Sequence, residues 1–208
     1  MTTAPARTTP ADGRNLRRDR NRDAVVTALL ELFRAGDLAP SAEQIAERAG
    51  ISVRSLFRYF DDVDDLVRTA VARQQQHLAP LYALDATPDQ PFPERVDRFV
   101  ACRVRLLEGM GEVGRAARVL AARQPLLLAE LARIRATLRR QVSSLFAAEL
   151  DALAPDERAA TLAAADVVTS WESFDLMRND QGLLRDEACA AMASALGRLL
   201  GPDNGAGR

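Results

Sequence analysis

The sequence predicts an all-α protein, because three features of its 208 residues agree. Apolar residues recur at the three- and four-residue spacing of helices along most of the chain. Proline and glycine separate these periodic segments, and no segment reads convincingly as a strand. Residues 42–60 read AEQIAERAGISVRSLFRYF, which predicts two short helices joined by a tight turn.

The first helix of this hairpin is expected to begin after Ser41 and to end near Arg48. The Ser41 hydroxyl can accept a hydrogen bond from an unpaired amide of the first turn. Ile45 and Ala49 lie four residues apart and therefore share one face of the helix. Gly50 follows at the turn, where a residue without a side chain can take a positive φ.

The second helix of the hairpin is expected to present a polar, basic face to solvent. Ser52 can cap it, and Leu56 and Phe60, four residues apart, can point inward. The remaining positions then share the outer surface: Val53, Arg54, Ser55, Phe57, Arg58 and Tyr59. Two interpretations of this pattern stay open, a helix-turn-helix reader of DNA and an ordinary helical hairpin with a solvated arginine face.

Helical patterns also flank the hairpin. Residues 22–34 carry apolar side chains at helical spacing and predict a preceding helix. A following helix is expected from Val63 to His77, with acids in its first turn, where the helix dipole favours negative charge.

Across these consecutive helices the chain resembles the TetR family of bacterial transcriptional regulators. The matching residues are 45–52 (IAERAGIS), 55–60 (SLFRYF) and 64–66 (DDL), within a match that covers about residues 23–66. The resemblance implies about nine helices, with a helix-turn-helix DNA-binding domain at 22–66 and a helical ligand-binding and dimerisation domain at 67–208. It also implies a sequence-specific DNA-binding transcriptional regulator, most often a repressor that a small molecule releases.

The charge distribution places the expected DNA partner at the N-terminal part of the chain. Residues 1–60 hold ten arginines and seven acids, whereas residues 61–208 hold eighteen arginines and twenty-two acids. The basic excess therefore lies with the expected DNA reader. The chain has no lysine, which we attribute mainly to codon bias because alanine is abundant and isoleucine is rare.

Several function classes lack their motifs in this sequence. Cys102 and Cys189 match no metal or redox spacing, and the single histidine, His77, belongs to no catalytic triad or HExxH motif. The glycines of GMGEVG at 109–114 lack the preceding strand of a phosphate-binding loop. No segment reads as a signal peptide or a membrane span. We therefore expect a cytoplasmic protein without catalytic activity, metal ion or cofactor.

Prolines and glycines divide the rest of the chain. Met1 to about Asn15 is rich in Thr, Ala and Pro and is expected to be disordered, within a flexible basic arm at 1–21. Residues 85–93 are expected to form a loop, and the glycines at 109, 111 and 114 to interrupt a helix. The expected C-terminal helices span 93–108, 115–122, 125–153, 155–179 and 183–200.

Contacts with bases are expected from the first turns of the second hairpin helix. Arg54 can bind O6 and N7 of one guanine, and Val53 can touch a thymine methyl group. Ser55 can bond a base or a phosphate. By the resemblance, the side chains that face the DNA backbone and the groove wall are Phe57, Arg58 and Tyr59.

Contacts with phosphate are expected at the helix N-termini and from the arm. Ser41 lies at a helix N-terminus, where amides and dipole favour an anion, and Ser52 holds the same position in the next helix. Arg14, Arg17 and Arg18 are expected to contact phosphate or to enter a minor groove. The alternative for these arginines is a solvated, fraying helix end.

Two departures from the family pattern weaken the expected affinity. Many members have tyrosine where this chain has Phe57, so a phosphate hydrogen bond is lost. Many also have lysine at the start of the fourth helix, where this chain has Val63 among four aspartates. Modest affinity with heavy reliance on the arginine arm is therefore expected.

The last two helices are the expected dimer elements. By the resemblance, two helices from each subunit form a four-helix interface, and the homodimer pairs two readers on a palindromic operator in double-stranded DNA. The alternative is that these apolar stripes build only the core of the monomer. The stripes consist of Ala163, Ala164, Val167, Val168, Trp171, Phe174 and Leu176, and of Ala188, Ala191, Met192, Ala195, Leu196, Leu199 and Leu200.

By the resemblance, the C-terminal helices enclose a pocket for an unidentified small-molecule effector. Arg103 or Asp175 could orient a polar group there, although packing in the core, and a solvent-directed side chain for Arg103, are alternatives. A helical protein-interaction module without DNA binding is the competing function. The candidate pocket residues are Phe99, Cys102, Arg103, Leu106, Met110, Leu120, Leu127, Trp171, Phe174, Asp175 and Met177.

Overall fold

The computed structural model describes residues 10–201, with side chains from residue 17 onward. Within this range all regular secondary structure is helical, as the sequence predicts, and it comprises ten α-helices where about nine were expected. Residues 1–9, which belong to the segment expected to be disordered, lie outside the described residues, as do residues 202–208.

The chain divides into two compact units. The first contains the residues up to Gln76 together with Glu112–Leu127, and the second contains His77–Gly111 together with the residues from Leu128 onward. The predicted domain boundary after Leu66 falls inside α4 (Val63–Leu78) and inside the first unit.

Helix α1 (Pro10–Arg34) begins well before the expected start at Arg22. Pro10 occupies the first helical position, where its missing N–H has no helical partner to lose and its fixed φ suits a helix. Residues 10–21 include several arginines, which are good helix formers, but lack the apolar periodicity of 22–34. The pattern therefore could not reveal this extension, and the expected flexible arm is helical from residue 10 onward.

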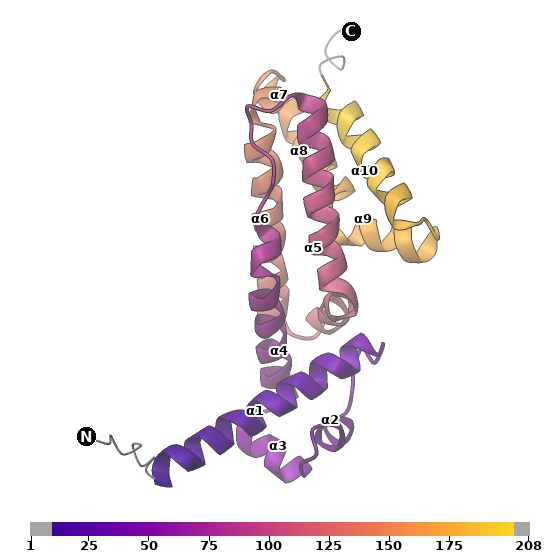
Figure 1. Cartoon of the computed structure of the whole chain (residues 1–208). Helices are drawn as coiled ribbons and strands as arrows, with labels where there is room; N and C mark the ends of the chain where they lie inside the picture. Colours follow the sequence, from indigo (N-terminus) through magenta and orange to yellow (C-terminus); the bar gives the residue numbers. More distant parts are fainter. Residues whose placement is uncertain (1–9, 202–208) are drawn as a thin grey trace, which may run out of the picture. The chain divides into compact units, whose positions relative to one another are not determined.

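Helix α1 crosses two short helices, α2 (Ala42–Arg48) and α3 (Val53–Tyr59), as Figure 1 shows. Helix α2 keeps its predicted bounds, and both short helices have the predicted N-caps, Ser41 and Ser52. Full burial of a large apolar side chain contributes roughly 1.5–3 kcal/mol, so their shared core supplies the stability that seven-residue helices lack. This core includes Val25, Val26, Leu29, Phe33, Ile45, Leu56, Phe60 and Leu66.

The turn between α2 and α3 depends on Gly50, whose φ is 68°. The N–H of Ile51 donates to the carbonyl of Ala46 at 3.0 Å, and the N–H of Gly50 donates to the carbonyl of Glu47 at 3.1 Å. These bonds satisfy carbonyl groups at the end of α2 and require a left-handed residue at this position. The turn therefore fixes how α3 leaves α2.

Helix α4 is started by an aspartate and tied to α1 by arginines. Asp62 Oδ1 accepts a hydrogen bond from the N–H of Asp65 at 2.6 Å, which caps the helix. Arg34 Nη2 donates to Gln74 Oε1 at 3.1 Å. Arg73 forms an ion pair with Asp23 of α1.

A short 3₁₀ helix, η1 (Ala79–Tyr82), follows α4 in the second unit. The long helix α5 (Phe92–Ala121) follows the expected loop and has residues in both units. Helix α5 is kinked at Gly111, with φ 43° and ψ −141°. Of the three glycines expected to interrupt a helix, Gly111 is therefore the one at which the backbone leaves the helical conformation. Gly109 stays helical and allows a close approach, since a Cβ there would lie 2.7 Å from Leu78 Cδ2.

Helix α6 (Pro125–Leu145) begins at the predicted proline but ends before the expected Leu153. Phe146 leaves the helical conformation, with φ −109° and ψ 30°, and a separate helix α7 (Ala147–Asp151) follows. The Phe146 ring is buried edge-on against Phe92 and Phe99, with centroid distances of 6.1 and 5.6 Å. This aromatic packing explains the break, which helical periodicity alone does not indicate.

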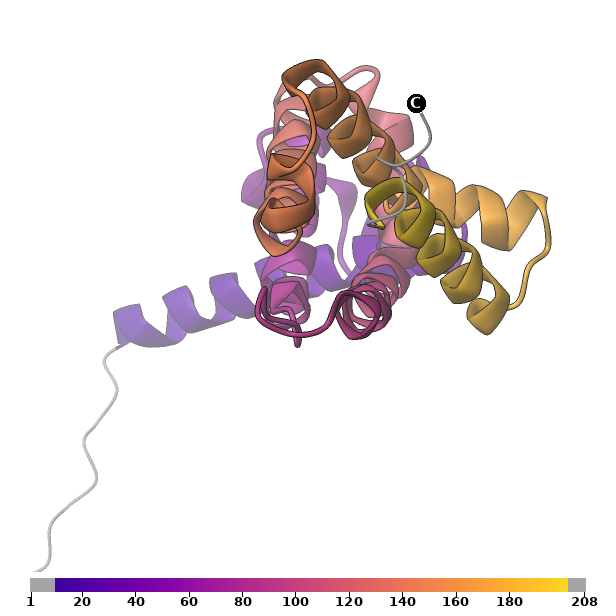
Figure 2. The ribbon, with the colours of Figure 1, turned by 90° about the horizontal axis from the view of Figure 1, so that it is seen from above.

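The helix expected over 155–179 is divided at Thr169 and Ser170. Helix α8 (Pro155–Val168) ends where the buried Thr169 hydroxyl donates to the carbonyl of Ala165 at 2.8 Å. Ser170 then caps α9 (Trp171–Asp175) by accepting a hydrogen bond from the N–H of Ser173 at 3.1 Å. A π-helical turn, η2 (Leu176–Asp180), follows, and α10 (Arg185–Leu200) packs beside α8 (Figures 1 and 2).

Replacement of Gly50 by alanine should lower the free energy of unfolding by about 1–2 kcal/mol, because a Cβ disfavours the left-handed backbone. Gly50→Asn is the matched control and should cost clearly less, since asparagine tolerates this conformation better. Denaturant unfolding of both variants measures the difference. Equal losses would show that the positive φ at this turn is not the constraint.

Candidate nucleic-acid interface

The outer face of α3 consists of the side chains that the sequence assigns to it. Arg54, Phe57 and Arg58 are exposed, and Phe57 leaves 46% of its surface accessible. Val53, Ser55 and Tyr59 are half-buried, while Leu56 and Phe60 are buried in the core, as predicted. A basic and aromatic surface on one short helix can therefore reach a partner without unfolding of the domain.

The two predicted serines already act within the chain. Ser52 Oγ accepts from the N–H of Ser55 at 3.2 Å and its hydroxyl lies 3.0 Å from Ser55 Oγ. Ser41 forms a reciprocal capping box with Gln44. Ser41 Oγ accepts a hydrogen bond from the Gln44 N–H at 3.3 Å, and Gln44 Oε1 accepts one from the Ser41 N–H at 2.7 Å. Glu43 lies in the same first turn, and its backbone amide and the Ser41 hydroxyl hold the pKa of its carboxyl below the usual value.

Tyr59 joins α3 to the arginine-rich part of α1. Its hydroxyl oxygen accepts hydrogen bonds from Asn21 Nδ2 at 2.9 Å and from Arg58 Nη2 at 3.2 Å. These two bonds lower the pKa of Tyr59, to which the charges of Arg58 and Arg18 also contribute. Both bonds use the oxygen as acceptor, so the hydroxyl hydrogen can be donated to an anion. We call these four residues, Arg18, Asn21, Arg58 and Tyr59, the basic cluster.

Sequence reasoning missed Asn21, because it lies 38 residues from Tyr59 and carries no motif. Around it, Arg17, Arg18 and Arg20 are exposed on α1, whereas the side chain of Arg14 lies outside the described residues. Arg22, one turn further, stacks its guanidinium over the Phe60 ring at 4.9 Å. The predicted arm therefore presents its arginines from a helix beside the end of α3.

The aspartates at the start of α4 were expected to repel DNA unless they are directed away. Three of them have partners within the first unit: Asp62 caps α4, and Asp65 lies 3.6 Å from Arg68. Asp64 Oδ1 accepts a hydrogen bond from Gln124 Nε2 at 2.7 Å. These three acids therefore have partners around the start of α4.

The arrangement is suited to insertion of α3 into a groove of a nucleic acid. Helix α3 projects side chains that can bond base edges, and the basic cluster supplies donors for phosphate oxygens beside it. Residues 25–70, which contain α3, match the family model described as bacterial regulatory proteins, tetR family.

Solved structures extend the likeness beyond these residues. A tetR-family transcriptional regulator from Streptomyces coelicolor superposes with a TM-score of 0.66 at 21% identity, over 87% of this chain and 80% of that one. Residues 25–70 thus carry the N-terminal domain of the TetR family, and this structure shares the fold of the whole chain. A transcriptional regulator from Rhodococcus sp. Rha1 superposes with a TM-score of 0.65 at 17% identity, over 86% of this chain and 95% of that one. No match was found among curated proteins.

The domain match and the shared fold support a DNA-binding transcriptional regulator. Across residues 10–201, no group of His, Cys, Asp and Glu side chains is arranged to hold a metal ion. Over the same range, none of its helices combines the length and the apolar character that a bilayer crossing requires.

The predicted pocket residues are distributed over both units. Leu120 and Leu127 belong to the first unit and the other nine to the second. Three of the eleven, Leu120, Asp175 and Met177, are half-buried, and the rest are buried. The pocket therefore stays a prediction, with most of its candidates packed in the cores of their units.

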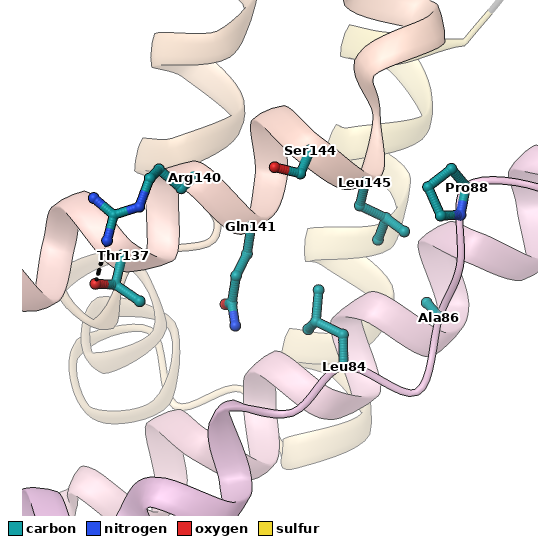
Figure 3. A pocket seen from close by; sticks show the side chains of 8 residues that line it. All are labelled: Leu84, Ala86, Pro88, Thr137, Arg140, Gln141, Ser144 and Leu145. Carbon is teal, nitrogen blue, oxygen red and sulfur yellow. Dashed lines mark hydrogen bonds between the residues drawn. The ribbon is translucent and has the colours of Figure 1, made fainter.

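Two described cavities in the second unit are lined by other residues. One, of about 410 Å³, is the α6 groove, which Figure 3 shows between α6 and residues 84–88. The other, of about 270 Å³, lies along α5 and α10. None of the predicted pocket residues lines either cavity. The α6 groove is lined by Leu84, Ala86, Pro88, Thr137, Arg140, Gln141, Ser144 and Leu145.

Arg103 is buried rather than directed to solvent, with 1% of its surface accessible. Its guanidinium donates to the carbonyls of Thr169 at 3.3 Å and Leu138 at 3.1 Å and to Gln141 Oε1 at 3.1 Å. It also stacks over Phe99 at 4.8 Å. Burial lowers the pKa of Arg103 to about 10, against the opposing effects of Asp166 and Tyr82.

The apolar stripes of α8 and α10 divide between the core and the surface. On α10, Ala188, Met192, Leu196 and Leu200 are buried, so the monomer core accounts for them. Ala191, Ala195 and Leu199, again four residues apart, are half-buried, and on α8 Val167 leaves 62% of its surface accessible. The monomer core thus accounts for one face of these helices, and the dimer role of the other face stays a prediction.

Proposed function

We propose that this regulator is a homodimeric repressor that binds a palindromic operator through α3 and leaves it when a small molecule binds the second unit. The observation that carries the proposal is the exposed face of α3, on which Arg54 and Arg58 project beside the arginines of α1. It would act in the cytoplasm, where bacterial DNA lies.

In the proposed complex, the first turns of α3 enter the major groove. Arg54 would bind a guanine through O6 and N7, Val53 a thymine methyl group, and Ser55 a base or a phosphate. The exposed ring of Phe57 would face the groove wall. Ser52 and Ser41 keep their capping bonds, so their part is to order the helix N-termini that face the backbone.

The basic cluster would bind the phosphates that flank the groove. Arg58 and Tyr59 already share a hydrogen bond, and Asn21 holds the Tyr59 ring from α1. Arg14, Arg17 and Arg18 would extend this contact along the DNA backbone. The backbone at these positions is already helical, which lowers the entropic cost of the contact.

The proposed dimer uses the outer faces of α8 and α10. Small side chains at Ala191 and Ala195 permit close helix packing, and Val167 and Leu199 add apolar area. Two-fold symmetry would then present two copies of α3 to one palindromic site.

Ligand-dependent release requires a link between the units. Helices α4, α5 and α6 each have residues in both units. A shift of any of these helices in the second unit would therefore move residues of the first unit. Gln124 at the start of α6 bonds Asp64 at the start of α4 within that unit. A ligand that binds the two states of these helices differently would change DNA affinity by that difference.

The operator can be obtained as the duplex that the protein selects from a random library. Arg54→Ala should weaken binding to this enriched duplex by roughly 1–3 kcal/mol and should hardly change binding to scrambled DNA. The lost bidentate contact to guanine is the reason. Fluorescence anisotropy with both duplexes measures this. Arg48→Ala is the matched control, because Arg48 is an exposed arginine on α2, 3.5 Å from Glu31. Equal losses on both duplexes would make Arg54 a phosphate contact.

Combined replacement of Arg14, Arg17 and Arg18 by alanine should flatten the salt dependence of DNA binding. Each lost phosphate contact lowers the slope of log K against log salt by about 0.9. A triple alanine variant at Arg133, Arg135 and Arg139 of α6 removes the same charge elsewhere and should leave the slope unchanged. An unaltered slope in the α1 variant would contradict a role for these arginines.

Ala195→Arg should convert the dimer into a monomer and weaken operator binding, because it places a charge at the proposed interface. Sedimentation velocity reports the mass relative to the 22.7 kDa chain. Ala132→Arg, on the exposed face of α6, is the control and should remain dimeric. A dimer that persists with Ala195→Arg would place the interface elsewhere.

A further inference from the structure

The second unit contains two buried arginines on one helix, and they differ in how they are paired. Arg95 and Arg103 lie on the same face of α5, with 5% and 1% of their surfaces accessible. Arg95 forms an ion pair with Glu149 and donates to the carbonyls of Leu145 at 2.9 Å and Gln90 at 3.0 Å. Arg95 is thus a buried cation with its counter-charge supplied by the chain.

Arg103 has no such direct ion pair, because Asp166, the acid whose charge acts on it, pairs with Arg139 at 3.5 Å. Its three hydrogen-bond acceptors are two carbonyls and an amide, all neutral, and it forms no ion pair among the described residues. The Nε–H of Arg103 is buried and has no hydrogen-bond partner among the described residues 10–201. A buried charge is costly unless it is paired, and an unsatisfied donor adds to that cost. The comparison with Arg95 indicates that an anion from outside the chain completes this site.

A route to Arg103 leads from the α6 groove through Gln141. Gln141 lines the groove, and Figure 3 shows its side chain extending from α6 toward the chain at Leu84. Its Oε1 accepts from Arg103 at 3.1 Å, while its Nε2 donates to the carbonyl of Tyr82 at 2.6 Å. Rotation of this one flexible side chain would exchange its amide oxygen for another acceptor at the guanidinium.

The groove itself indicates the rest of the ligand. Its wall combines the apolar side chains of Leu84, Pro88 and Leu145 with the hydroxyl groups of Thr137 and Ser144. Its volume of about 410 Å³ lies within the range of small-molecule sites, roughly 300–1,000 Å³. A ligand with an apolar chain and a single anionic head group would match both the wall and the buried cation.

We propose that the second unit binds an amphipathic carboxylate, with its apolar chain in the α6 groove and its head group on Arg103 in place of the Gln141 amide. Binding of the carboxylate does not depend on the proposed function. Its role as the effector that releases DNA rests on that function. The carboxylate accepts two hydrogen bonds from the guanidinium, as planar carboxylates do with arginine.

The test compares decanoate with 1-decanol, which has the same chain without the charge, by isothermal titration calorimetry in the absence of DNA. The wild-type protein should bind decanoate at least tenfold more tightly than decanol. Arg103→Met should remove that preference, whereas Arg133→Met, at an exposed arginine of α6 that does not line the groove, should change it less than threefold. Equal affinity of the wild type for the two probes would overturn the proposal, whatever the variants do.

Thermal unfolding separates a binding role of Arg103 from a structural one. Arg103→Met should keep or raise the melting temperature, because the variant removes an unpaired buried charge. Arg95→Met should lower the melting temperature, since it leaves Glu149 without its partner. A fall for Arg103→Met as large as that for Arg95→Met would show that Arg103 serves the fold and would overturn the proposal.

Operator binding is measured separately by anisotropy with the enriched duplex. Release of the duplex by decanoate and not by decanol would support the carboxylate as effector. A protein that binds the duplex but shows no preference for decanoate would contradict this inference and leave the repressor intact. A protein that prefers decanoate but binds no DNA would contradict the proposed function and leave the carboxylate site standing.

Discussion

The burial of Leu56 and Phe60 against α1 is the contact on which the DNA-binding surface depends. Helix α3 has seven residues, too few to be stable as an isolated helix, so packing supplies its stability. With Leu56 fully buried and Phe60 beneath Arg22, the rotation of α3 about its axis is set. At 3.6 residues per turn, the positions between them must then point away from the core.

The same polar groups order the fold and shape the interface. Ser52 caps α3, Asn21 holds Tyr59, and the aspartates that start α4 are engaged by their own neighbours. Such preorganised groups lose little conformational entropy when a ligand binds. The second unit follows the opposite rule at Arg103, where a buried cation has only neutral partners. We interpret this contrast as a difference in preorganisation. The polar groups of the DNA-binding surface already have partners within the chain, whereas Arg103 lacks the anion that a ligand would supply.

The elements predicted correctly from sequence are those specified by local signals. Ser41, Gly50 and Ser52 determine where α2 and α3 begin and end, because caps and turns depend on neighbours in the chain. The breaks at Phe146 and Thr169 depend on tertiary packing and on a side-chain bond, and periodicity passes over them. The outward residues of α3 follow from its period, whereas the pairing of Asn21 with Tyr59 and the burial of Arg103 join distant segments and left no local pattern.

The most direct measurement of the central claim is dimethyl sulfate footprinting of an enriched operator duplex, since the reagent methylates guanine N7 in the major groove and adenine N3 in the minor groove. If α3 is an outward rod in the major groove, the protein should protect guanine N7 at two symmetric places separated by about one helical turn or a multiple of it. This protection should weaken at the guanine contacted by Arg54 when that residue is alanine. Unchanged N7 reactivity in a duplex that the protein binds specifically would contradict the account.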